Sequence, residues 1–122
     1  MGIKIGCAAW TWTEPAHNPP YEEAIKSIGE LGFDGIELIL RDFEDVVNYW
    51  TKDKRKEIKS MVDYYGLQVS QFAMFQNVLD GLASLEEEKK NRSIEAFKNG
   101  CEISADLGCD IVNFVSPWPR TV

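Results

Sequence analysis

The residues that could do chemistry in this sequence stand at the ends of short apolar runs. Trp10 and Trp12 follow the first run, which begins at Ile3. A tryptophan ring has a flat face that packs well against the C–H groups of a ligand. The two rings could therefore form one wall of a binding site. The alternative is that they pack in the core or at an interface.

Glu37 is the one acid inside the apolar run from Ile36 to Leu40. If Ile36 and Leu38 face neighbouring helices, alternation along a strand turns Glu37 to the opposite face. Burying a carboxylate is costly unless it is paired. We therefore expect Glu37 either to contact a substrate, directly or through another residue, or to pair with Lys4 or another residue on the same face.

The remaining candidates follow later runs or lie in a loop. Phe72, with Met74 and Phe75, could line a pocket near the third run or fill the core instead. Three residues close the fourth run: Asn113, Ser116 and Trp118. His17 lies in a loop between prolines, and a single loop histidine is typical of a solvated residue, with substrate contact as the alternative.

The cysteine and histidine content disfavours several kinds of site. The chain has one His and three Cys, and no C-x-x-C spacing, so it cannot supply a His-rich zinc site. The odd number of cysteines argues against a disulfide framework. Cys7, Cys101 and Cys109 stand in apolar contexts, which is typical of buried, reduced thiols.

A regular alternation of strands and helices positions the candidate residues. We predict strands near residues 3–9, 36–40, 68–74 and 111–115. The nearly continuous apolar run at 36–40 is typical of a parallel strand buried on both faces. Apolar residues at helical spacing lie between successive strands, and Gly32, Gly66 and Gly108 end these helices.

This pattern is one β/α unit repeated, and right-handed crossovers build such repeats into a parallel sheet. A complete TIM barrel needs about 250 residues, whereas this chain has 122. The fold class is therefore α/β: residues 1–122 form either the first half of a TIM barrel or a small open sheet of flavodoxin type. An open sheet usually carries a Gly-rich phosphate loop. The segment Gly6 to Trp10 lacks the second and third glycines, which disfavours a flavin or nucleotide site.

Composition restricts the partners. Acids outnumber Lys and Arg by 20 to 13, which argues against binding to a nucleic-acid backbone. The short basic cluster at 52–56 includes Asp53 and is typical of a solvated helix start. Apolar stretches fall far short of the ~20 residues that span a bilayer, and no secretory segment begins the chain. We expect a soluble, cytoplasmic protein without a membrane partner.

Several sequence phrases together resemble a known family: Lys4–Trp12, Tyr21–Ile25 and Leu31–Leu38, the last reading LGFDGIEL. They are similar to the opening of the sugar phosphate isomerase/epimerase family, which has the xylose isomerase-like TIM barrel and is related to endonuclease IV. Residues 65–70 and 107–112 fit its third and fourth strand entries.

The resemblance implies a metal-dependent isomerase or epimerase acting on a small carbohydrate. A divalent metal (Mn, Mg, Co or Zn) would polarise substrate oxygens while carboxylates move a proton at the adjacent carbon. The family's metal ligands lie on later strands. No metal ligand and no catalytic residue is therefore carried over to this chain, and we expect it to be inactive alone.

Seven residues are candidates for contact with the sugar, and the resemblance places the last three by the substrate: Trp10, Trp12, Glu37, Phe72, Asn113, Ser116 and Trp118.

Two other functions remain open. Four parallel strands leave two open edges, which favour association. Two copies could close one eight-stranded barrel, giving a homo-oligomeric binding or scaffold domain without catalysis. An endonuclease IV-like barrel is the other alternative. That branch uses histidines on early strands, and the segment from Gln71 to Met74 has none.

Overall fold

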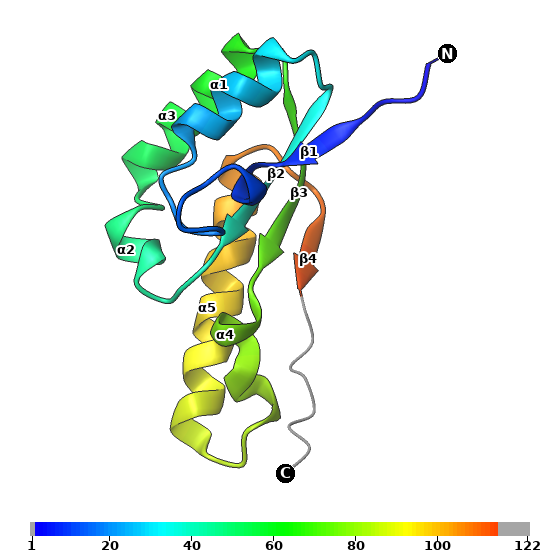
Figure 1. Ribbon diagram of the computed structural model, residues 1–122. Coiled ribbons are helices and arrows are strands. Elements are labelled where there is room, and N and C mark those ends of the chain that lie inside the picture. Colours follow the sequence, from blue (N-terminus) through cyan, green and yellow to red (C-terminus); the bar gives the residue numbers. More distant parts are fainter. Residues whose placement is uncertain (1, 115–122) are drawn as a thin grey trace.

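The computed structural model describes residues 2–114 and contains one parallel sheet (Figure 1). Its strands are β1 (Gly6–Ala8), β2 (Gly35–Leu40), β3 (Gln68–Met74) and β4 (Val112–Phe114). They lie in the order β1-β2-β3-β4, each parallel to the next. In a doubly wound sheet the first strand lies inside the sheet rather than at its edge. The sequential order is therefore that of a barrel.

The helices that connect the strands lie on one side of the sheet (Figure 1). The long ones are α1 (Glu22–Glu30), α3 (Lys52–Tyr64) and α5 (Glu87–Asp106). Short turns of helix follow the strand ends: η1 (Ala9–Thr11), α2 (Asp45–Asn48), α4 (Gln76–Leu79) and η2 (Asp80–Ala83). Within residues 2–114, no helix covers the opposite face of the sheet.

Glycine ends each long helix, as the sequence predicts. Gly32, Gly66 and Gly108 have φ of 85°, 70° and 71°, a left-handed conformation that glycine adopts without steric cost. The start of α3 is fixed by Thr51, whose hydroxyl accepts a hydrogen bond from the backbone N–H of Lys54 at 3.2 Å. These local signals set how each strand enters the sheet.

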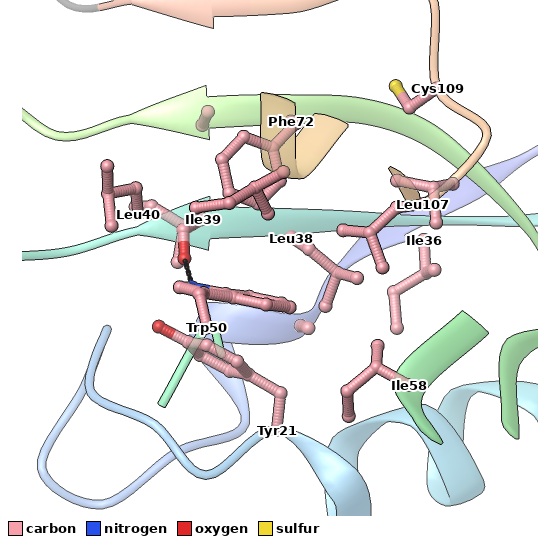
Figure 2. Close-up of a cluster of buried hydrophobic side chains, with 14 of the residues drawn as sticks. Tyr21, Ile36, Leu38, Ile39, Leu40, Trp50, Ile58, Phe72, Leu107 and Cys109 are labelled. Atoms are coloured by element: carbon pink, nitrogen blue, oxygen red, sulfur yellow. Dashed lines mark hydrogen bonds between the residues drawn. The ribbon is translucent and has the colours of Figure 1, made fainter. Parts of the chain in front are cut away.

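The core lies between β2 and the helices (Figure 2). Ile36, Leu38 and Leu40 have no exposed surface. Trp50 is also fully buried, and its indole N–H donates to the carbonyl oxygen of Ile39 at 3.0 Å. Figure 2 shows the Tyr21 ring next to the Trp50 ring, and their centroids are 5.9 Å apart. This layer fixes which face of β2 points to the helices.

Arg55 departs from the solvated helix start expected at 52–56. It is 5% exposed, its Nε donates to the carbonyl oxygen of Trp50, and its Nη1 lies 2.8 Å from Asp106 Oδ2. A buried charge needs such partners. The ion pair joins α3 to the end of α5, a contact that local composition cannot predict because Asp106 is distant in sequence.

The first strand is shorter than the expected segment 3–9. Only Gly6–Ala8 pairs with β2. The chain then turns into η1, where the N–H of Trp12 donates to the carbonyl oxygen of Ala9 at 3.0 Å and the Thr11 hydroxyl donates to that of Ala8. The last strand, expected at 111–115, is observed at Val112–Phe114, and residue 115 lies outside the described residues. Within residues 2–114, no helix has both the length and the apolar character needed to cross a membrane.

Glu22 links α1 to α3 through an ion pair and to the end of α2 through a hydrogen bond. Lys54 Nζ lies 2.9 Å from Oε1, and the Tyr49 hydroxyl donates to Oε2 at 3.0 Å. Burial alone would raise the pKa of Glu22, but the hydrogen bonds and the charge of Lys54 lower it overall. A lowered pKa means that the carboxylate stabilises the fold above the unfolded pKa and stops doing so as the pH falls through the folded pKa.

We therefore predict that Glu22→Gln lowers the free energy of unfolding at pH 7 by up to about 1 kcal/mol, because the pair is partly exposed. The difference from the wild-type chain should shrink as the pH falls below 4.5, the ordinary pKa of this group. Urea denaturation at several pH values measures it. Glu23→Gln is the matched control, because Glu23 is exposed in the same helical turn. An equal, pH-independent loss in both variants would contradict the prediction.

Candidate functional site

A β-bulge in the middle of the sheet sets the geometry of the candidate site. Ile36 pairs with Val69, but Glu37 pairs with Gln71, which leaves Ser70 as an extra residue on β3. Without this shift, residues 69 and 72 would point to opposite faces. With it, Val69 and Phe72 are both buried, while Ser70 is exposed and Gln71 is half-buried. The bulge therefore turns Gln71 toward Glu37 on the face without helices.

Glu37 accepts a hydrogen bond on each carboxylate oxygen. The indole N–H of Trp10 donates to Oε1 at 2.7 Å, and the side-chain amide of Gln71 donates to Oε2. One side chain on β2 thus connects the end of β1 to β3. A carboxylate has about four lone-pair positions. Glu37 therefore keeps capacity to accept hydrogen bonds from a ligand while both donors hold it in place.

Three aromatic or heteroaromatic rings and one guanidinium group form a continuous stack beside Glu37. The rings of Trp10 and His17 are 4.6 Å apart and nearly parallel, with 19° between their planes. His17 and Phe75 follow at 5.2 Å and 40°. The guanidinium carbon of Arg41 lies 4.6 Å from the centre of the Phe75 ring. Stacking and cation–π contacts of this kind favour a rigid arrangement.

The stack lies at one edge of the sheet. Trp10, Arg41 and Phe75 follow the carboxyl ends of β1, β2 and β3. At this edge Arg41 is paired with Asp42, with 3.3 Å between Nη1 and Oδ2, and Asn77 also donates to Asp42. Burial raises the pKa of the nearby Asp45 carboxyl, and the negative charge of Asp42 adds to this effect, although the backbone N–H of Asp42 opposes it. The positive charge of Arg41 therefore lies among acids.

A separate hollow lies at the opposite end of the sheet. It has a volume of about 490 Å³ and includes residues that begin or precede the strands, among them Gly6, Gly35 and Gln68. In barrels of parallel strands the active site forms at the carboxyl ends, whereas the amino ends serve stability. We therefore assign the candidate site to the group of Glu37, Gln71 and Trp10, which lies between the middle of the sheet and the residues that follow the strands, and not to this hollow.

The comparisons with known proteins agree with the strand order. The family model described as "Xylose isomerase-like TIM barrel" matches residues 24–121. This chain belongs to that family. A comparison with curated proteins finds no match. Among solved structures, D-psicose 3-epimerase with D-tagatose from Clostridium cellulolyticum H10 matches with a TM-score of 0.74 and 15% identity. The match covers 92% of this chain and 37% of the epimerase chain.

These findings confirm the resemblance to the isomerase/epimerase barrels and the predicted fold class. The four parallel strands and their helices are the N-terminal half of a TIM barrel. The open flavodoxin-type sheet is excluded, because its first strand would lie inside the sheet. The chain spans little more than a third of the length of the epimerase that it matches.

In this half-barrel the structure brings only some of the predicted residues together. Trp10 and Glu37 are in direct contact. Trp12 lies apart: it is 45% exposed, and its indole N–H is 3.3 Å from Cys7 Sγ. Phe72 has no exposed surface and packs against Trp50. It therefore fills the core, which is the second of the two roles considered for it.

Of the three candidates at the fourth strand, the structure describes one. Asn113 lies in β4, is exposed, and pairs with Ala73 of β3. Ser116 and Trp118 lie outside the described residues. Glu37 forms hydrogen bonds with residues on its own face of the sheet, which is one of the two roles considered for it. Its partners are Trp10 and Gln71. Lys4, the partner suggested by sequence, borders the hollow at the other end of the sheet.

Sequence reasoning missed two members of the group. Gln71 could not be identified because its direction depends on the bulge, which needs the paired strand. For His17 the sequence favours a solvated loop, with substrate contact as the alternative, yet its ring packs against two aromatic rings. The only sequence signal for His17 is that it is the single histidine and follows the Trp10–Trp12 segment closely.

The residues that the structure describes do not form a metal site. Within residues 2–114, no group of three or more His, Cys, Asp and Glu side chains is arranged to hold a metal ion. Glu37 is the acid at the centre of the site, and both of its oxygens already accept hydrogen bonds. What the arrangement can do chemically is to hold hydroxyl groups by hydrogen bonding next to a flat aromatic surface.

We predict that Gln71→Glu lowers the free energy of unfolding by about 1–2 kcal/mol at pH 7, because it sets a second carboxylate against Glu37. Two such groups share a proton, so one pKa of the pair rises. Stability should therefore recover as the pH falls through that raised pKa. Urea denaturation between pH 7 and pH 4 checks this.

Gln68→Glu adds the same charge at an exposed position of the same strand and serves as the control. If both variants unfold alike at every pH, the Gln71 amide is not held on Glu37.

Proposed function

We propose that this chain is the N-terminal part of a metal-dependent sugar or sugar phosphate isomerase or epimerase. The observation that carries the proposal is the Glu37 carboxylate, which Trp10 and Gln71 fix on the face of the sheet opposite the helices, in a half-barrel of the xylose isomerase-like family. The matched solved structure is an epimerase with a ketohexose, which supports a small carbohydrate as substrate. Support for the class of reaction comes from family membership.

In this proposal the chain supplies binding rather than the proton transfer. Trp10 offers a ring face to the C–H side of a sugar, and Glu37 and Gln71 offer acceptors and donors to its hydroxyl groups. The proposed sugar contacts also include Trp12, Asn113, Ser116 and Trp118. A divalent metal would polarise the substrate oxygens, and its ligands would come from strands that follow the fourth. We propose a cytoplasmic location for the same enzyme.

The first test is sugar binding by the 122-residue chain. We expect calorimetry to detect weak, saturable binding of D-tagatose, and Trp10→Ala to weaken it roughly tenfold because the ring face is lost. Tyr64→Ala is the control, since Tyr64 is an aromatic residue on α3 that is 83% exposed. Equal binding by both variants, or no binding by the wild-type chain, would contradict the proposal.

The same chain should convert no D-tagatose when Mn²⁺, Mg²⁺, Co²⁺ or Zn²⁺ is added, because residues 2–114 do not form a metal site. Chromatography of the sugar after incubation measures this. Conversion above the buffer control would show that the chain carries its own catalytic centre and would refute the assigned division of labour.

Self-association is a second candidate role, favoured by apolar side chains at both ends of the strand order. Ile3 and Ile5 precede β1 and are 92% and 58% exposed. Ile111 and Phe114, at β4, are 57% and 52% exposed. Unpaired edge strands with apolar side chains favour addition of another strand. A second copy of this half-barrel would cover both edges and form a homo-oligomer.

We expect sedimentation velocity to show dimers at high concentration, and Phe114→Lys to shift the chain toward monomer because it charges the β4 edge. Leu85→Lys is the control, because Leu85 is fully exposed but lies away from both edge strands. A wild-type chain that stays monomeric at every concentration would exclude this role.

A further inference from the structure

The loop between η1 and α1 is fixed at its middle, beside Trp10, whose indole contacts Glu37. The backbone N–H of His17 donates to the carbonyl oxygen of Trp10 at 3.0 Å. The hydroxyl of the buried Tyr21 donates to the carbonyl oxygen of His17 at 2.8 Å. His17 has φ of 75°, a left-handed conformation that non-glycine residues adopt uncommonly. The fold therefore holds this residue in an unfavourable backbone conformation.

Two aromatic rings pack against the His17 ring. Trp10 stacks on one side at 4.6 Å, and Phe75 lies against the ring at 5.2 Å. The side chain is half-buried. Stacking covers the face of a ring, whereas both imidazole nitrogens lie on its edge, where a ligand can reach them.

The two ring nitrogens have no partner in the described part of the chain. No hydrogen bond or ion pair of residues 2–114 involves them, whereas the neighbouring indole N–H is taken by Glu37. A neutral imidazole carries one donor and one acceptor, which matches the two functions of a sugar hydroxyl. If stacking were the only role, phenylalanine would fill it as well.

We propose that His17 is a specificity-determining residue whose imidazole forms a hydrogen bond with a hydroxyl of the bound sugar, next to Glu37. This inference rests on the proposed function and adds a residue to that same site. Trp10 and Phe75 set the plane of the ring, Tyr21 sets the position of the loop, and Glu37 sets the position of Trp10. A sugar that lacks the matching hydroxyl would leave the nitrogen unpaired and bind less tightly.

His17 is the only histidine, so its ring signals in an NMR spectrum are unambiguous. The ring proton and nitrogen signals of the wild-type chain should shift on addition of D-tagatose and saturate at the dissociation constant that calorimetry gives. H17F keeps a ring in the stack but removes both nitrogens. We expect it to weaken D-tagatose binding roughly three- to tenfold, the usual size of one hydrogen bond. Its thermal unfolding and the Trp10 indole signal should stay close to wild type.

The outcomes separate this proposal from the one on which it rests. If D-tagatose binds but the His17 signals do not move and H17F binds equally well, the contact is absent and the proposed function stands. If D-tagatose binds to no variant and not to the wild-type chain, both proposals fail. If H17F does not fold, the wild-type ring signals decide alone, since they require no substitution.

Discussion

The arrangement of this half-barrel depends on where the charge of Glu37 is placed. The strand that carries it is otherwise apolar, and one of its faces is closed by Trp50 and the helices. A carboxylate cannot lie in that core without a large loss of solvation. It therefore lies on the other face, where the Trp10 indole and the Gln71 amide each donate to one oxygen. Three consecutive strands are connected through this one side chain.

The β-bulge at Ser70 provides one of the hydrogen-bond donors that Glu37 needs. It lets β3 bury Val69 and Phe72 on the helix side while it presents Gln71 to Glu37. A regular strand could not do both, because its side chains alternate strictly. The same irregularity thus serves packing on one face and hydrogen bonding on the other. Trp10, which follows the carboxyl end of β1, joins this pair to the side of the sheet where barrels bind substrate.

The loop after η1 adds a second layer to the site. The stack from Trp10 through His17 and Phe75 to Arg41 joins segments that follow β1, β2 and β3. The orientation of Trp10 is fixed twice, by a hydrogen bond at its edge and by a ring on its face. A side chain fixed in this way loses little further freedom on binding, which favours affinity. A half-barrel could therefore hold part of a sugar-binding surface in place before the rest of a barrel completes it.

The sequence alone determined the repeated β/α unit and where its strands and helices lie along the chain. Helical spacing, the three helix-ending glycines and the apolar run at 36–40 act locally, so the order of strands and helices could be read from them. They left a half-barrel and an open sheet as alternatives, and the family resemblance favoured the half-barrel. The position of Glu37 on the face away from Ile36 and Leu38 also followed, because strand alternation is local. Tertiary structure decided its partners. The bulge exists only against β2, and the stack of His17 needs the ends of β1 and β3 together. The burial of Arg55 depends in the same way on Asp106, far along the chain.

Periodicity in the sequence indicates which face of a strand or helix a residue occupies. Strand pairing and helix packing determine its neighbours on that face, because they bring together residues that are distant in sequence.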